Sequence, residues 1–199
     1  MNNDISWVAI LGAVTGVLGT LGWIVQYIVK FVTKPKLIFL EGPYVKDWYF
    51  IGTPEHRKYV NLDVSVKNKK TAKRCIAIME IIKHPETVTH LEKQQPLHWA
   101  DVPFSGSTSM EPIDIGGESH RLDIVFTIPR ISGANIAMPI ALMAPFHAPQ
   151  AILPPGEYVV KVSVSCDNGK TISKSIHLTS PANWEDLKAE EIKTDKKSP

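Results

Sequence analysis

The stretch YVNLDVSVK, from Tyr59 to Lys67, decides the fold. Every second residue in it is apolar, which is the period of a β-strand with one face in a core and the other in water. The inward set is Val60, Leu62, Val64 and Val66. The outward set, predicted to face water, is Asn61, Asp63, Ser65 and Lys67.

The same alternation recurs farther along the chain, in Arg121–Ile128 and in Tyr158–Cys166. A turn signal, Asp167 to Lys170, follows the second of these, and Thr171–Leu178 then has the character of the returning strand of a hairpin. These segments predict antiparallel strands that share one core.

Three further strands are predicted by composition. Cys75–Ile82 is apolar on both faces except for Glu80, which predicts a central strand covered on both sides. Leu37–Leu40 and Trp48–Ile51 are shorter candidates. About seven short strands separated by turns predict a mainly β domain, an immunoglobulin-like β-sandwich over residues 35–181, with a small barrel as the alternative.

Two long connections interrupt the strands. Lys83–Gly117 is rich in proline, which predicts a loop with a brief strand at Leu97–Trp99. Residues 131–156 carry no charged side chain and five prolines, and these prolines argue against a second membrane crossing. We favour a buried edge strand at Ile136–Met143 over an apolar loop that rests on the bilayer or on a partner.

The C-terminal residues 182–199 are predicted to lie outside the sandwich. Acidic and basic side chains alternate in Trp184–Lys193, which is typical of a short exposed helix. Residues 194–199 have the composition of a frayed polar tail.

The N-terminal residues 1–34 form a predicted transmembrane anchor. Ile5–Val29 spans twenty-five residues without a charge. A helix of this length measures roughly 37 Å, enough to cross a hydrocarbon core of about 30 Å with some tilt. Trp7, Trp23 and Tyr27 lie where aromatic rings favour the headgroup boundary. A cleaved signal peptide is disfavoured because no basic residue precedes the apolar run.

The flanking charges orient this single-pass helix. Lys30, Lys34 and Lys36 follow it, whereas only Asp4 precedes it. The positive-inside rule therefore predicts an outside N-terminus and a cytoplasmic β domain, with an extracytoplasmic β domain as the alternative. Small residues on one helix face provide a candidate helix-pairing surface, although glycine is common in transmembrane helices generally. They are Ala9, Gly12, Gly16 and Gly19.

Whole-chain charge and cysteine content exclude several classes of protein. The chain has 22 Lys and Arg against 20 Asp and Glu, so it lacks the basic excess of a nucleic-acid binder. Its two cysteines, Cys75 and Cys166, show neither CxxC nor zinc-site spacing, so neither a disulfide framework nor a structural metal is predicted. One inter-strand bridge between them stays open.

No catalytic, cofactor-binding or metal-binding residue is predicted, and we expect that the protein is not an enzyme. His84, His90 and His98 share one loop, but a solvated loop explains them better than a metal site because no helical or paired spacing pre-forms one. No nucleophile motif or phosphate-binding loop occurs. The basic cluster at residues 67–74 fits either anionic lipid or a polar turn that prevents edge pairing.

A set of structural positions resembles the CARDB-like group of immunoglobulin-like domains on prokaryotic membrane and surface proteins. The matching positions are Val64, Val66, Asn68, Ala72, Cys75, Ile115, Gly117, Glu118, Leu122, Pro155, Gly156, Tyr158, Asp167 and Asn168. The resemblance covers about two-thirds of the chain and implies a sandwich used in adhesion or scaffolding outside the cell, in conflict with the orientation that the lysines predict. It implies no catalytic residue.

These observations predict a membrane-anchored, non-enzymatic module for protein–protein interaction or scaffolding. Its partners would be the bilayer and another protein or a second copy of itself, but not nucleic acid. The alternative is a membrane-tethered sensor or binding protein for a small ligand or metal, with the histidine-bearing loop as its site.

Overall fold

The computed structural model describes residues 23–26, 34–49, 56–88, 93–100, 112–129, 131–137 and 152–193. The chain divides into two compact units, Met1–Lys34 and Pro35–Pro199. Among the described residues, no helix has the length and apolar character needed to span a membrane. The predicted segment Ile5–Val29 lies outside the described residues except for Trp23–Gln26, which are helical.

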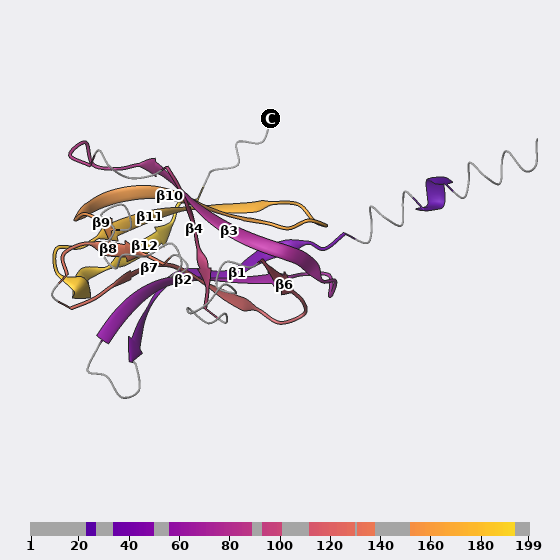
Figure 1. The fold of residues 1–199 in the computed structure, drawn as a ribbon, viewed down its shortest axis with the longest axis horizontal. Helices are drawn as coiled ribbons and strands as arrows, with labels where there is room; N and C mark the ends of the chain where they lie inside the picture. Colours follow the sequence, from indigo (N-terminus) through magenta and orange to yellow (C-terminus); the bar gives the residue numbers. More distant parts are fainter. Residues whose placement is uncertain are drawn as a thin grey trace, which may run out of the picture. The chain divides into compact units, whose positions relative to one another are not determined.

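Two antiparallel sheets build the second unit (Figure 1). The first has the order β1-β2-β7-β8-β9, and β5 also pairs with β7. Its strands are β1 (Leu37–Tyr49), β2 (His56–Val66), β5 (His98–Trp99), β7 (His120–Thr127), β8 (Ala134–Ile136) and β9 (Ile152–Leu153).

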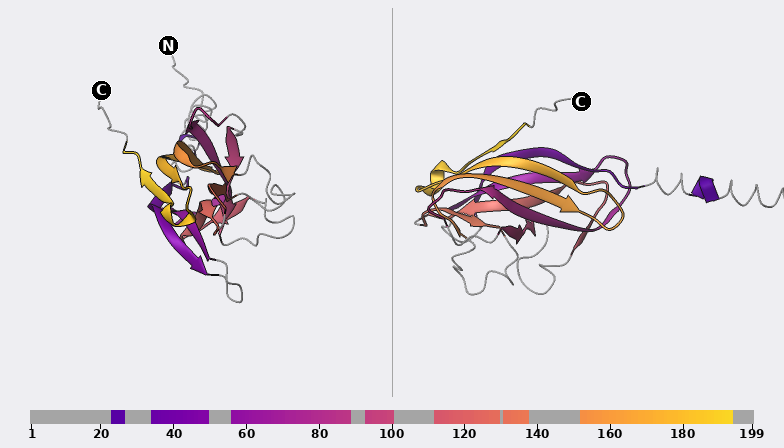
Figure 2. Two further views of the ribbon diagram at one scale, coloured as in Figure 1. Left: turned by 90° about the vertical axis from the view of Figure 1, so that its left-hand side faces the viewer. Right: turned by 90° about the horizontal axis from the view of Figure 1, so that it is seen from above.

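The second sheet has the order β12-β11-β10-β3-β4, and β6 also pairs with β3. Its strands are β3 (Ala72–Lys83), β4 (Gln94–Pro96), β6 (Ile113–Ile115), β10 (Gly156–Ser165), β11 (Ile172–Ser180) and β12 (Lys188–Glu191). The two sheets face each other as the layers of a sandwich (Figure 2). The prediction of a mainly β, sandwich-type fold is confirmed.

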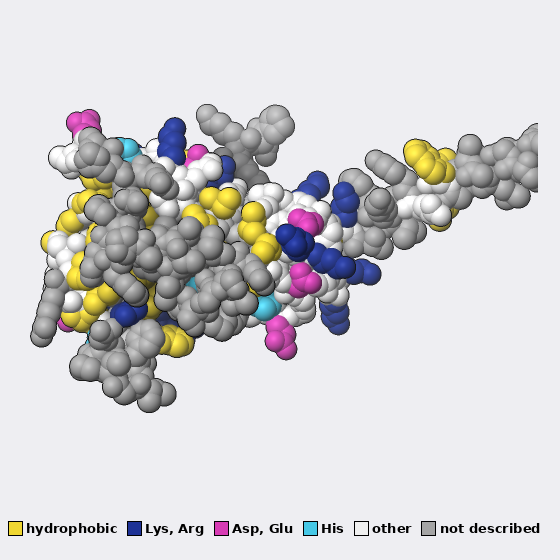
Figure 3. Space-filling model, in the orientation of Figure 1, with side chains coloured by type: hydrophobic (Ala, Val, Ile, Leu, Met, Phe, Trp, Pro, Cys, Tyr) yellow, Lys and Arg dark blue, Asp and Glu magenta, His cyan; other side chains and the backbone are white. Residues whose placement is uncertain are grey.

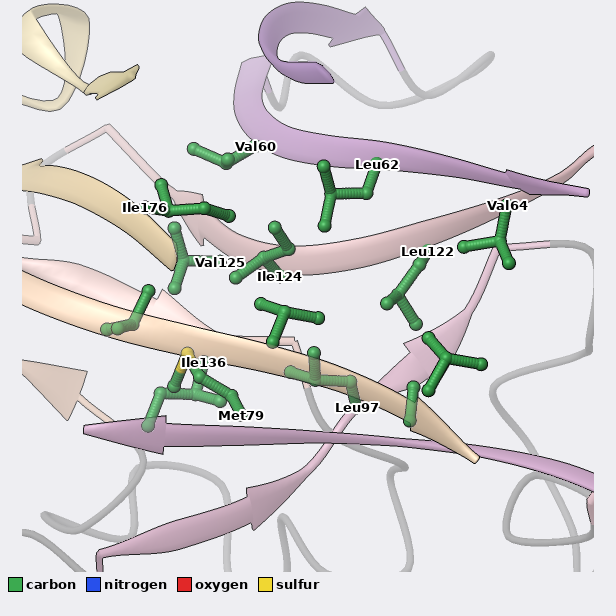
Figure 4. Close-up of a cluster of buried hydrophobic side chains, with 14 of the residues drawn as sticks. Val60, Leu62, Val64, Met79, Leu97, Leu122, Ile124, Val125, Ile136 and Ile176 are labelled. Atoms are coloured by element: carbon green, nitrogen blue, oxygen red, sulfur yellow. The ribbon is translucent and has the colours of Figure 1, made fainter. Parts of the chain in front are cut away.

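The core lies between the sheets and comes from the alternating positions that the sequence marks (Figure 4). Val60, Leu62 and Val64 of β2 are fully buried, as are Val160 and Val162 of β10. Burial of one such side chain stabilises the fold by about 1.5–3 kcal/mol. The period-2 pattern therefore placed the correct residues inside.

The outward-facing half of the pattern differs from the prediction in both sheets. Asn61 and Ser65 were expected in water, but only 2% and 7% of their surfaces are exposed, so that prediction is wrong. Conversely, Ile76 and Ile82 of β3 are 43% and 54% exposed, so the predicted cover over both faces of this strand is also wrong. The outer face of the first sheet is partly closed, whereas β3 is open on its outer side.

Strand β1 is continuous where two short strands were predicted. Its pairing with β2 is irregular between Phe39 and Tyr44, on either side of Glu41. Gly42 passes through this irregularity with φ of 92°, and a Cβ there would lie 2.6 Å from the Asn61 carbonyl oxygen. The strand therefore continues through a bulge that only glycine fits.

The C-terminal residues form a 3₁₀ turn, η4 (Trp184–Asp186), followed by strand β12. The predicted short helix over Trp184–Lys193 is therefore wrong. Lys188 to Glu191 pair with β11 from Thr179 back to Ile176, and the side chain of Leu187 is buried against the core. Pairing with an existing edge gives this segment a partner to fold against, whereas an isolated helix of this length is only marginally stable in water.

Both long connections contribute strands. The proline-rich segment forms β4, β5 and β6 in addition to the predicted loop. In the uncharged segment, β8 is buried, lies between β7 and β9 and ends at Ile136, the first residue of the predicted strand Ile136–Met143, which therefore stays a prediction. The rest of the predicted strand, residues 138–143, lies outside the described residues.

Candidate functional site

A groove of about 440 Å³ lies beside the outer end of the β1–β2 hairpin. Residues from strands β1 and β2 and from the η4 turn line it, together with Pro129, which lies just after β7. The lining residues are Asp47, His56, Lys58, Pro129, Trp184 and Glu185. The groove thus combines an indole, an imidazole, one cation and two carboxylates.

The η4 turn is tied to the first sheet by its backbone. Thr127 Oγ1 donates to the Trp184 carbonyl over 2.9 Å, and Lys58 Nζ donates to the Glu185 carbonyl over 2.7 Å. Both bonds are made to backbone carbonyl groups of the turn, and Trp184 itself is partly exposed. The Trp184 ring meets the His56 ring edge-on at 6.3 Å, and Lys58 Nζ lies 5.9 Å from the indole centroid.

This groove has the chemistry of a recognition surface. A tryptophan held on a fixed turn provides a large apolar contact with little loss of side-chain freedom, and such residues are enriched at binding hot spots. Asp47 lies opposite Lys58 in the β1–β2 register, so charges of both signs border the ring. Sequence analysis missed the groove because Trp184 was assigned to an exposed helix.

A buried polar cluster lies on the outer side of the first sheet. Asn61 Nδ2 donates to Asp123 Oδ1 over 2.5 Å, and Arg121 Nε lies 3.6 Å from the same carboxyl oxygen. His98 Nδ1 lies 3.9 Å from Asp123 Oδ2, with its side chain fully buried. The buried Asp123 carboxyl group therefore has an amide, a guanidinium and an imidazole as its neighbours, the kind of partners that a buried carboxyl group needs.

Aromatic side chains extend this outer face toward β1. The Arg121 guanidinium lies 4.7 Å from the Trp48 ring centroid, a cation–π distance. Tyr44 donates its hydroxyl proton to Asp63 Oδ1 over 3.0 Å. Burial, together with that carboxylate, raises the pKa of Tyr44 to about 12.

The candidate histidines are not brought together where the structure describes them. His84 follows β3 and is exposed, and its Nδ1 lies 2.9 Å from the Pro85 carbonyl oxygen. His98, by contrast, is buried in β5. His90 lies outside the described residues. Among the described residues, no group of three His, Cys, Asp or Glu side chains could hold a metal ion.

The predicted basic cluster lies at the end of the sandwich where the chain enters at Pro35. The Lys67 amide donates to the Lys36 carbonyl over 3.0 Å, and the Lys36 amide donates to Asn68 Oδ1 over 3.2 Å. The Lys73 amide donates to Asn168 Oδ1 over 2.8 Å, which joins the β2–β3 and β10–β11 turns. These contacts gather exposed side chains of both signs at one end, with basic ones in the majority (Figure 3): Lys36, Lys67, Lys69, Lys70, Lys73, Arg74 and Lys170, beside Asp114, Glu118 and Asp167, the last of which pairs with Arg74 over 3.2 Å.

The candidate helix-pairing residues Gly12, Gly16 and Gly19 lie outside the described residues. Comparison with known proteins gives no further guide to the site, since no protein-family model, curated protein or solved structure matches this chain.

Proposed function

We propose that this chain is a membrane-anchored, non-enzymatic β-sandwich module that binds another protein at the membrane surface. Residues 5–29 serve as the anchor in this proposal, and the groove beside Trp184 serves as the contact surface. The partner is a different protein or a second copy of this chain.

The observation that carries the proposal is the difference between the two ends of the sandwich. The entry end at Pro35 bears exposed lysines, and each such charge near an anionic leaflet contributes up to about 1 kcal/mol of attraction. The groove lies at the other end of β2. Lys58 and Lys67 are nine positions apart, a distance of roughly 30 Å at strand spacing. An anchored domain with its basic end toward lipid therefore presents the groove away from the bilayer.

We also infer that the sandwich is of the immunoglobulin-like type, as the CARDB-like resemblance implies. The order β1-β2-β7-β5 in one sheet corresponds to strands A-B-E-D, and β3-β10-β11 in the other corresponds to C-F-G. Domains of this type commonly present binding surfaces at the ends of the sandwich. We place the domain in the cytoplasm on the evidence of Lys30, Lys34 and Lys36, with the extracytoplasmic side as the alternative.

A membrane-tethered binding protein for a small ligand is the second candidate function. The groove volume of about 440 Å³ favours it, because small-molecule sites commonly measure about 300–1,000 Å³. A ligand site of this kind would give no protein crosslink in the experiment below. It would instead show ligand-dependent quenching of Trp184 fluorescence.

Site-specific photocrosslinking of the full chain in its own membranes tests the proposal. A photoreactive phenylalanine derivative at Asp47, on the groove, is expected to give a discrete crosslinked protein band. Trp184→Ala is expected to reduce the yield of that band about tenfold or more, because loss of an interfacial tryptophan typically costs 2 kcal/mol or more. A band at twice the chain mass identifies the partner as a second copy.

The matched control places the same probe at Ser173, an exposed residue on the outer face of β11. This position is expected to give no discrete band. Identical bands from both positions, or a band unaffected by Trp184→Ala, would contradict the groove as the contact surface. A thermal melt of Trp184→Ala close to that of the wild type confirms that the variant is folded.

A further inference from the structure

The strand register places the two cysteines of the chain opposite each other. In the antiparallel β3–β10 pair, Val164 pairs with Ala77 and Ser165 pairs with Ile76. Continued one position beyond its last pair, this register brings Cys166 opposite Cys75, and the Cys166 thiol lies within hydrogen-bonding reach of the Cys75 thiol. Residues opposite each other in such a pair have Cα atoms about 4.5–5.5 Å apart, within the range of about 4.4–6.8 Å that a disulfide requires.

Both sulfur atoms lie on the same face of this sheet. Cys75 is fully buried on the core side of β3, in the same alternating set as Ala77 and Met79. Cys166 follows Val164 at the same period and packs against the same core. The side chains therefore point in one direction from adjacent strands, as a cross-strand bridge requires.

The two thiols differ in their access to solvent. Burial, and next the neighbouring Cys166 thiol, raises the pKa of Cys75 to about 12. Cys166 is only half-buried, under the β10–β11 turn, where a Cβ on Gly169 would lie 2.7 Å from its sulfur. Both cysteines are free in the structure. An oxidant therefore reaches Cys166 first.

We propose that Cys75 and Cys166 are a dithiol–disulfide pair that closes when the domain meets a small disulfide oxidant. The Cys166 thiolate attacks the oxidant, forms a mixed disulfide and releases one thiolate. Cys75 then gives its proton to the released thiolate and attacks the Cys166 sulfur. The bond between Cys166 and the oxidant sulfur breaks, and that sulfur departs as a thiolate, which takes up from solvent the proton that Cys166 had released to solvent. Two protein thiols are oxidised to one disulfide, and one oxidant disulfide is reduced to two thiols.

Closure joins β3 to β10 beside the entry of the chain at Pro35. The bridge links positions ninety-one residues apart, and constraints over long spans restrict the unfolded chain most. The oxidation state of the pair also indicates the compartment of the domain, since such thiols stay reduced in the cytoplasm and form disulfides outside it. This inference does not depend on the groove or on its partner.

The test equilibrates the detergent-solubilised full chain in reduced and oxidised glutathione. After unfolding and alkylation, the oxidised sample is expected to show no alkylated cysteine. Its mass is expected to be two hydrogen atoms below that of the reduced, unalkylated chain, and proteolysis is expected to give a peptide that joins Cys75 to Cys166. Its melting temperature is expected to exceed that of the reduced sample by roughly 5–15 °C. Reductant should reverse all of these changes.

Cys166→Ser is the matched control, and its melting temperature is expected to be the same in both buffers. Cys75→Ala is a second control with the same expected result. Alanine is used at this position because Cys75 is fully buried and serine would place a hydroxyl group in the core. Glutathione retained on Cys166 of the wild type, or two alkylatable thiols after full equilibration in the oxidised buffer, would overturn the proposal.

Discussion

Replacing Asp123 by alanine is expected to lower the free energy of unfolding by about 3–5 kcal/mol. The change removes the carboxylate that accepts from Asn61 and lies 3.6 Å from the Arg121 guanidinium. The buried Asn61 amide then loses its acceptor and Arg121 loses its neighbouring carboxylate while it keeps its contact with the Trp48 ring, and the loss at Asn61 dominates the cost. Urea unfolding followed by circular dichroism measures the difference.

Two variants calibrate this result. Asp123→Asn keeps an acceptor for Asn61 and loses only the charge, so its expected cost is about half. Asp63→Ala removes the carboxylate that accepts the hydrogen bond of the Tyr44 hydroxyl, and it should lower the free energy of unfolding by about 1 kcal/mol. Equal losses for Asp123→Ala and Asp63→Ala would show that the cluster does not hold the outer face together.

Neighbouring isoleucines on β3 provide the second large effect. Ile81→Ala is expected to cost about 2–5 kcal/mol, because this side chain is 4% exposed and its removal leaves a cavity in the core. Ile82→Ala should cost less than about 0.5 kcal/mol, because its side chain is 54% exposed on the other face. The pair has the same chemistry, the same strand and adjacent positions.

Chemical denaturation of both variants under identical conditions makes the comparison. A loss at Ile82 as large as that at Ile81 would mean that the outer face of β3 is covered. That outcome would support the prediction from the sequence that β3 is covered on both faces.

The alternating segments were predictable because one period decides both the element and the buried face. The strand from Tyr59, the strand from Arg121 and the hairpin after Tyr158 lie where the pattern predicts them. Strand β12 was not predictable, because Lys188 to Glu191 become a strand only through their pairing with β11. Its sequence carries no apolar period that would mark it.

The candidate site depends on neighbours that the sequence does not give. Asn61 and Asp123 are ordinary outward positions until the β2–β7 register places them opposite each other. Trp184 enters the groove only because Thr127 and Lys58 hold its backbone. A bridge between the two cysteines was left open by the sequence, because only the structure shows that β3 and β10 are neighbours.

Membrane attachment is the central claim, and alkaline carbonate extraction of membranes that contain the full chain tests it most directly. The wild type is expected to stay in the membrane pellet. A double variant, Leu11→Arg with Leu18→Arg, is expected in the supernatant, since each arginine adds about 2.5–3.5 kcal/mol to insertion. Release of the wild type as complete as that of the variant would contradict the account.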